Sequence, residues 1–370
     1  MNEITHMHIE AKYCLNGLHE NEMTYEQKQL RYLIDVDNTP WKTLGLKRLS
    51  HLFSTNDGAS ERAEVAMLYK KISSQGIFIN QHGLLALTEQ QREKLQQDPF
   101  SEPLYKALKW LQRLTTDIDG RLRTPISPYH SITGRAGLFG TTPINGFKSF
   151  KRQLITAPNG YCALSVDYSA CEVGILAALS GDKLLRNDYS LSADFYAVLL
   201  ERIILKEDLN LERSQTKLLM LMSIYGASQR SIGDTLHVSE TIAAQLQNQL
   251  FAIYPQAFTW LHQQTITSYQ SKRILSQHWQ IYVSHHARPT QVRNWPIQMM
   301  GVEIINLASQ LADTAGLKII GLVHDCIYIE STNESVLAET VKLKAIMASA
   351  SQQLLGGFEL KTDVDFTTQH

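Results

Sequence analysis

The chain has 370 residues, 44% of them hydrophobic and 19% charged, so it can bury a substantial core in two or three compact units. It carries no tract resembling a signal peptide and no apolar run long enough to span a bilayer, which indicates a cytoplasmic protein without a membrane partner. Its four cysteines have no C-x-x-C spacing, so neither a disulfide framework nor a zinc site is indicated.

The net charge of −1 gives no overall electrostatic signature of a nucleic-acid-binding protein. Contacts to nucleic acid would therefore rest on local groups of basic residues. Three such groups are present: Lys148 with Lys151 and Arg152, Lys272 with Arg273, and His285, His286, Arg288 and Arg293.

The first half of the chain alternates between helical and irregular patterns. Residues 1 to about 60 have no strong period and no assignable chemistry. A helical pattern runs from about 60 to 118 and is interrupted by a short strand candidate at 77–80. The stretch 124–145 is rich in Gly, Pro, Ser and Thr and predicts an extended loop. A strand at 160–166 and a helix at 170–179 follow.

The second half begins with a region, from about 183 to 275, that is predicted to be helical almost throughout. A long helix around 301–315 comes next. The apolar runs 317–323 and 326–330 then predict a hairpin with an aspartate at its tip. A helix at 335–354 and a strand at 359–364 complete the predicted elements.

Two aspartates that lie 158 positions apart are the main candidates for chemistry. Asp167 in S-V-D-Y-S and Asp325 in V-H-D-C each stand where a strand-type run meets a turn. If the fold brings the two carboxylates together, they form a hard-oxygen site for divalent cations, most plausibly Mg2+. Two such ions are the usual apparatus of in-line phosphoryl or nucleotidyl transfer.

The helix that leads to Gly226 carries a second pattern. Arg213, Lys217 and Leu221 are spaced four residues apart, which places them along one side of a helix. Two cations on one stripe can clamp a phosphate, although an isolated R-x-x-x-K pair is usually only an exposed basic edge. The continuation to Tyr225-Gly226, in the order R-x-x-x-K-x-x-x-L-x-x-x-Y-G, favours the functional interpretation.

These segments together resemble the three motifs of family A DNA polymerases. Residues 213–226 resemble motif B, and D-Y-S-A-C-E-V-G-I-L-A at 167–177 resembles motif A, usually D-Y-S-Q-I-E-L-R-I-L-A. Val323-His324-Asp325 resembles motif C, usually V-H-D-E. The motifs occur in the family's order and at similar spacing, and the resemblance covers roughly residues 120 to 370. It implies an enzyme that extends a primer on template DNA with deoxynucleoside triphosphates, in replication or repair at the nucleoid.

The resemblance also implies an α+β right-hand fold, with an antiparallel-sheet palm, helical fingers and a reduced helical thumb. The expected parts are an N-terminal segment of unknown role (1–59), a reduced thumb-like helical region with a loop (60–133), the first part of the palm with motif A (134–182), the fingers with motif B (183–291) and the second part of the palm with motif C (292–370).

Site roles follow from the same resemblance. Asp167, Asp325 and the carbonyl of Tyr168 would hold two Mg2+ ions, for which Mn2+ can substitute. Arg213 and Lys217 would bind the incoming triphosphate, and Lys217 would donate a proton to pyrophosphate, so that Asp167, Asp325 and Lys217 are the expected catalytic residues.

Further positions contact the nucleotide and the DNA in the family. Glu172 occupies the steric-gate position, where together with Tyr225 it would crowd the sugar 2′ carbon and exclude ribonucleotides. Leu221 and Tyr196 stand at the base-stacking and phosphate-binding positions. Contacts to the primer-template terminus are expected from Arg135, Asn294, Gln298 and His324.

Several residues depart from the family pattern. Cys326 replaces the glutamate of motif C, which predicts lower activity while both main metal ligands remain. Leu221 replaces an aromatic residue, Tyr196 replaces a histidine and Gly174 replaces an arginine. These changes are typical of a divergent branch similar to the polymerases of mobile elements and phages.

Only 134 residues precede Arg135, and they contain no acidic D-x-E arrangement in a strand context. We therefore expect no 3′–5′ exonuclease and a shortened thumb, for which 60–118 is the best candidate. Low processivity is expected unless a partner clamps the DNA, and a separate nuclease or a processivity factor is a candidate partner.

Two alternatives remain. A single-subunit RNA polymerase of phage type also carries R-S-x-T-K and Y-G in motif B, but Glu172 argues against it because that group has a small residue there. The other is a catalytically weak, DNA-binding accessory protein of replication. The joint presence of both aspartates with the motif B cations argues against that loss of activity.

Overall fold

The computed structural model describes residues 17–23, 28, 59–78, 117–138, 157–204 and 211–366. These residues form helices around antiparallel sheets, which confirms the α+β class predicted from sequence. Residues 79–116 of the predicted helical region and the basic group at 148–152 lie outside the described residues.

A four-stranded antiparallel sheet is the centre of the molecule, with strands in the order β10-β5-β9-β8. Its members are β5 (Tyr161–Tyr168), β8 (Ile319–Val323), β9 (Cys326–Thr332) and β10 (Thr362–Phe366). The strand predicted at 160–166 and the hairpin with Asp325 at its tip are confirmed as β5 and as β8 with β9. Burial of the whole run 162–166 explains why β5 has no polar alternation.

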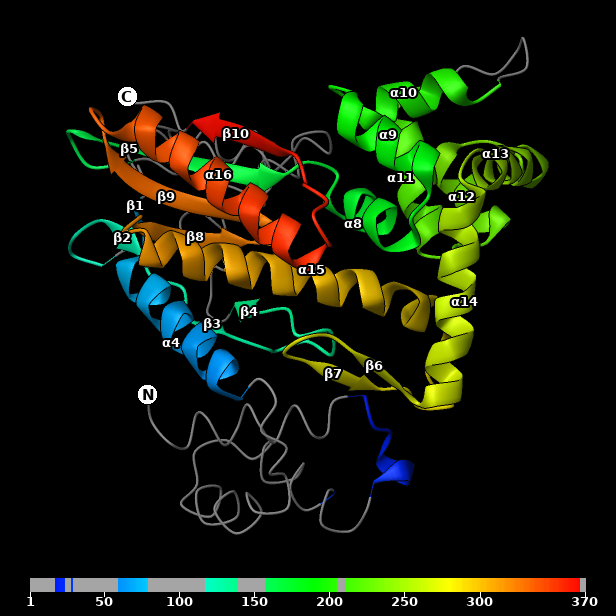
Figure 1. Ribbon diagram of the computed structural model, residues 1–370, viewed down its shortest axis with the longest axis horizontal. Helices are drawn as coiled ribbons and strands as arrows, with labels where there is room; N and C mark the ends of the chain where they lie inside the picture. Colours follow the sequence, from blue (N-terminus) through cyan, green and yellow to red (C-terminus); the bar gives the residue numbers. More distant parts are fainter. Residues whose placement is uncertain are drawn as a thin grey trace, which may run out of the picture.

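Two helices complete the core around this sheet. α16 (Val336–Leu354) lies across β5, β9 and β10, and α15 (Pro289–Thr314) packs against α16 and β8 (Figure 1). The sequence predicted α15 only from 301, twelve residues late, because Pro296 suggests a break. The helix continues through Pro296, since burial of Val292, Trp295 and Ile297 compensates for the missing hydrogen bond.

A group of helices separates β5 from β8 in the sequence and lies together at one end of the sheet (Figure 1). The helices are α8 (Cys171–Ser180), α9 (Lys183–Leu191), α10 (Phe195–Arg202), α11 (Arg213–Ile224), α12 (Gln229–Leu236), α13 (Glu240–Ile253) and α14 (Pro255–Ser271). The helical prediction for 183–275 is confirmed except at its end, where β6 (Arg273–Leu275) pairs with β7 (Gln280–Tyr282). None of the helices in the described ranges is both long and apolar enough to cross a bilayer.

The segments before β5 are attached to the sheet and to α15. α4 (Ala59–Gln75) packs against β8 and α15, where the hydroxyl of Tyr69 donates to Asn306 Oδ1 at 2.6 Å. β1 (Ile77–Phe78) confirms the predicted short strand and pairs with β2 (Arg121–Leu122). The predicted loop contains one two-residue pairing, β3 (Ile126–Ser127) with β4 (Gly137–Leu138). A 3-10 turn, η1 (Glu20–Glu22), lies further upstream.

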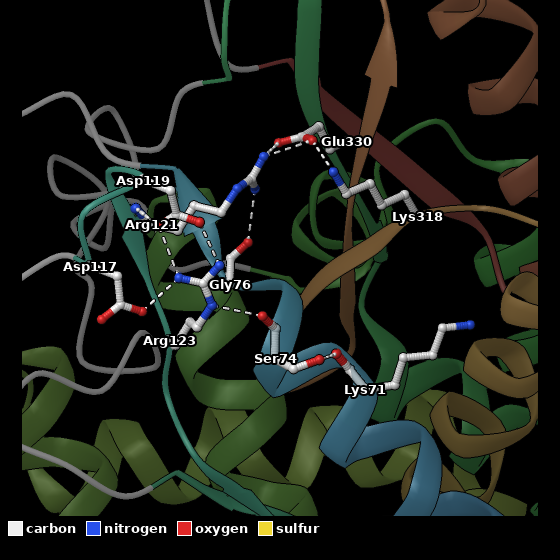
Figure 2. Close-up of polar contacts among 9 residues, drawn as sticks. All are labelled: Lys71, Ser74, Gly76, Asp117, Asp119, Arg121, Arg123, Lys318 and Glu330. Atoms are coloured by element: carbon white, nitrogen blue, oxygen red, sulfur yellow. Dashed lines mark hydrogen bonds and ion pairs between the residues drawn. The ribbon is translucent and has the colours of Figure 1, made fainter.

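A buried ion cluster fastens β2 to the sheet (Figure 2). The side chain of Glu330 on β9 is only 1% exposed and accepts two hydrogen bonds from Arg121 Nη2, at 3.0 and 2.8 Å, and one from Lys318. Arg121 also donates to the carbonyl of Gly76 at 3.2 Å, at the end of α4. The carboxylate of Glu330 therefore holds α4 and β2 against β9.

Replacement of Glu330 by Gln should destabilise the protein by about 3 kcal/mol, because the variant leaves the guanidinium of Arg121 partly buried without its counter-charge. Urea unfolding at neutral pH measures this change. The matched control is Asp313→Asn, which removes the partner of Lys71 in an exposed pair and should cost about 0.5 kcal/mol or less. Equal losses of unfolding free energy in the two variants would contradict the conclusion that Glu330 holds α4 and β2 against β9.

Candidate active site

An open cavity of about 780 Å³ lies where the ends of β5 and β8 meet α8, α10, α11 and α15. Eleven of the thirteen site residues expected from sequence line it. They are Arg135, Asp167, Tyr168, Glu172, Tyr196, Arg213, Lys217, Leu221, Tyr225, His324 and Asp325.

The two aspartates meet because β5 and β9 are neighbours. The register pairs Asp167 with Cys326, so Asp325 lies in the turn beside it, and Tyr168 N–H donates to the Asp325 carbonyl at 3.3 Å. His324 adopts a left-handed φ of 57°, as the tight hairpin turn requires. Burial raises the pKa of the Asp325 carboxyl, although a hydrogen bond with Asp167 acts in the opposite direction.

The donor set fits a hard divalent cation. The β5–β9 pairing brings Asp167 and Asp325 into the same cavity, and these two carboxylates would supply the oxygens that hold such a cation. Among the described residues there is no group of three or more His, Cys, Asp and Glu side chains placed to hold a metal. Mg2+ suits this arrangement, since it is usually bound by one or two protein carboxylates and takes its other oxygens from water and phosphate.

Glu172, in the first turn of α8, contacts Tyr225 at the end of α11 and Arg135 in the segment before β5. Its Oε1 accepts a hydrogen bond from the hydroxyl of Tyr225 at 2.6 Å and lies 3.5 Å from Arg135 Nη2. Burial, followed by the charge of Glu172, raises the pKa of the Tyr225 hydroxyl, which therefore stays protonated as a donor. Glu172 and Tyr225 thus form one wall of the cavity, from the start of α8 to the end of α11.

Arg213 and Lys217, the two cations of motif B, line the cavity from the first turns of α11. The guanidinium carbon of Arg213 and Nζ of Lys217 lie 5.5 and 5.8 Å from the centroid of the Tyr196 ring. Arg213 also pairs with Asp194, with Nη2 at 3.1 Å from Oδ1, and this pairing lowers the pKa of the Asp194 carboxyl. Tyr196 therefore serves as a platform under both cations.

Three charged residues of the cavity wall were not anticipated: Asp194, Lys361 and Asp363. Asp194 caps α10 by accepting from Tyr196 N–H at 3.0 Å, and an aspartate directly before a helical run was a signal that could have found it. Asp363 belongs to the last strand and Lys361 directly precedes it, and nothing in their local sequence indicates a site. They reach the cavity because β10 pairs with β5, which sets Asp363 opposite Asp167.

Two of the expected DNA-contacting residues, Asn294 and Gln298, do not line the cavity. Both lie on α15, and Asn294 is buried and donates to the carbonyl of Thr290 at 2.9 Å. In the nearby basic group, Arg293 donates to the carbonyl of Ile224 at 2.9 Å and His285 lies 2.9 Å from Glu22. The side chains of Arg293 and His285 therefore already contact other residues of the chain.

The family model for DNA polymerase family A matches residues 86–369. The chain belongs to DNA polymerase family A. It is 26% identical to a DNA polymerase of Mycobacterium phage L5 over 40% of this chain, and 23% identical to DNA polymerase I of Chloroflexus aurantiacus over 66% of it. These matches cover 24% and 28% of the relatives, so the chain spans only about a quarter of their length.

The fold of this family A chain resembles that of a solved relative, the POL domain of Pol1 from M. smegmatis in complex with DNA primer-template and dNTP. The TM-score is 0.76 at 16% sequence identity, and the match covers 97% of this chain and 80% of the other. This similarity confirms the polymerase fold predicted from the three motifs.

The raised pKa of Asp325 gives a prediction for the stability of the family A domain. Because burial disfavours the ionised carboxyl, the contribution of Asp325 to stability is present below its unfolded pKa and is lost as pH rises through its folded pKa. Asp325→Asn should therefore melt about 2 °C or more above the wild type at pH 8, and this gap should narrow towards pH 4. Differential scanning calorimetry measures both values.

Asp365→Asn is the matched control, since Asp365 is an exposed residue of β10 that does not line the cavity. It should leave the melting temperature nearly unchanged at both pH values. An Asp325→Asn variant that melts below the wild type at pH 8 would show that the ionised carboxylate stabilises the fold.

Proposed function

We propose that the chain is a DNA-directed DNA polymerase, which adds deoxynucleotides to a primer 3′ end and releases pyrophosphate. The observation that carries this proposal is the cavity in which Asp167 and Asp325 face Arg213 and Lys217. A carboxylate pair opposite a pair of cations suits a substrate that brings a metal-bound triphosphate. The names of the relatives, and the primer-template and dNTP held by the M. smegmatis domain, support the same activity.

Asp167 and Asp325, with the carbonyl of Tyr168, are proposed to hold two Mg2+ ions, or Mn2+ in their place. When bound, such ions stabilise the charge on the attacking 3′ oxygen and on the leaving pyrophosphate. The chain contributes the rigid placement of both carboxylates, because each stands at the end of a paired strand.

Arg213 and Lys217 are proposed to bind the triphosphate from the opposite side of the cavity. Their position over the Tyr196 ring aligns both cations before the substrate arrives. Lys217 is the proposed proton donor to the departing pyrophosphate, since it forms no ion pair with the described residues and its ammonium can serve as a general acid. Leu221, on the same stripe of α11, would contact the incoming base.

The wall formed by Glu172 and Tyr225 is proposed to exclude ribonucleotides. Their hydrogen bond fixes two bulky groups in one place, so that a 2′ hydroxyl would clash or compete for it. Arg135, which contacts Glu172, and His324 are proposed to touch the primer-template terminus from the same cavity. Asn294 and Gln298 are proposed to contact the DNA from α15, outside the cavity lining.

Primer extension on a short primed template with Mg2+ tests the activity. Purified wild-type protein should extend the primer with deoxynucleotides. Asp325→Ala should reduce the rate by about a thousandfold or more, because it removes charge stabilisation at the reacting atoms. Absence of extension by the wild type, or extension that is unaffected in Asp325→Ala, would refute the polymerase proposal.

The gate is tested by competition between deoxy- and ribonucleotides. Glu172→Ala should lower the preference for deoxynucleotides about tenfold or more, because the wall loses the group nearest the sugar. Tyr225→Phe keeps the ring but lacks the hydroxyl bonded to Glu172, and should give a smaller loss. An unchanged preference in both variants would remove these residues from the gate, while a wild type that prefers ribonucleotides would favour an RNA-polymerase-like enzyme.

A further inference from the structure

Lys361 lies in the cavity wall but belongs to none of the three motifs. β10 pairs with β5 so that Asp363 is opposite Asp167, and Ser169 N–H donates to the carbonyl of Lys361 at 2.9 Å. Lys361 is the residue directly before β10, and it lines the same cavity as Asp167.

The charges around the cavity single out this lysine. Arg135 and Arg213 each form an ion pair with a carboxylate of the cavity wall, which cancels much of their charge. Lys217 and Lys361 also line the cavity, and neither forms an ion pair with any residue of the described ranges. A polyanion that enters the cavity thus meets two lysines that are outside any ion pair of the described ranges, one on α11 and one beside β10.

The ammonium of Lys361 is held in place with donors to spare. Nζ donates to the carbonyl of Ser192 at 2.8 Å and lies 4.8 Å from the centroid of the Tyr189 ring. It also interacts electrostatically with Asp363 and with Asp194, the carboxylate that pairs with Arg213. Because an ammonium has three N–H groups, the hydrogen bond to Ser192 leaves two of them for oxygens of a ligand in the cavity.

Gly174 allows the segment that carries Lys361, just before β10, to pack closely against α8. A Cβ atom at position 174 would lie 2.5 Å from Leu360 Cδ2 and 2.6 Å from Tyr189 Cζ, so no side chain fits there. The hydroxyl of Tyr189 in turn accepts the Lys361 N–H at 3.1 Å. The glycine that stands in place of the usual arginine of motif A therefore permits close packing, and this packing brings Lys361 to the cavity from the residue before β10.

We propose that Lys361 is a third binding residue for the polyphosphate of the substrate, together with Arg213 and Lys217. The assignment rests on the proposed function, since it places the ligand in the same cavity. The chemical group bound is the triphosphate of the incoming nucleotide, and after reaction the pyrophosphate. Lys361 also supplies the positive charge that Tyr196 lacks in comparison with the histidine usual in the family.

Calorimetric titration of the full chain with dTTP and Mg2+, without primer or template, tests the assignment independently of turnover. Lys361→Met should weaken binding about tenfold, equivalent to about 1.4 kcal/mol, because one cation is lost from the polyphosphate site. Lys361→Arg should retain most of the affinity. Lys344→Met is the matched control, since Lys344 is exposed on α16 away from the cavity, and it should bind as the wild type does.

Primer extension provides the second readout. In Lys361→Met the KM for dTTP and the inhibition constant of inorganic pyrophosphate should both rise about tenfold, while kcat should change by less than about twofold. A purely structural role would instead lower the melting temperature and would not separate KM from kcat.

The outcomes distinguish this assignment from the proposed polymerase activity. Equal dTTP affinity in wild type and Lys361→Met, or a wild type that does not bind dTTP, would overturn the role of Lys361. Weakened binding that coincides with a lowered melting temperature and is not restored in Lys361→Arg would also overturn it. If the wild type binds dTTP through Lys361 but extends no primer, the polymerase proposal fails and the polyphosphate site stands.

Discussion

The antiparallel pairing of β5 with β9 is the contact on which the cavity depends. It sets Asp167 opposite Cys326, so that Asp325 in the adjoining turn comes to lie beside Asp167. A shift of register by one residue would move the Asp167 side chain to the other face of the sheet. The register is well specified because β5 is buried from Cys162 to Val166 and has helices against it. Core packing and site geometry are therefore set by the same pairing.

This arrangement places like charges together in a partly buried position. Burial raises the pKa of the Asp325 carboxyl, so ionisation of this side chain costs more free energy in the folded protein than in water. Stability is recovered elsewhere, in the buried sheet and in the ion cluster around Glu330.

The departures from the family's usual residues have local structural reasons in two places. Gly174 is required because Leu360 and Tyr189 occupy the space of a side chain. Tyr196 replaces a histidine, yet its ring lies under both motif B cations. The TM-score of 0.76 at 16% identity shows that the family A fold tolerates such exchanges, because it depends on the pattern of buried positions more than on residue identity.

Local sequence was sufficient to predict β5, the β8–β9 hairpin and α11, because apolar runs and a four-residue spacing are properties of neighbouring residues. The same reasoning began α15 at 301, twelve residues too late, because tertiary packing outweighs the local cost of Pro296. Asp194, Lys361 and Asp363 joined the cavity only through the tertiary structure. Lys361 and Asp363 approach Asp167 through a strand pairing that spans almost two hundred positions, and no local pattern encodes such a contact.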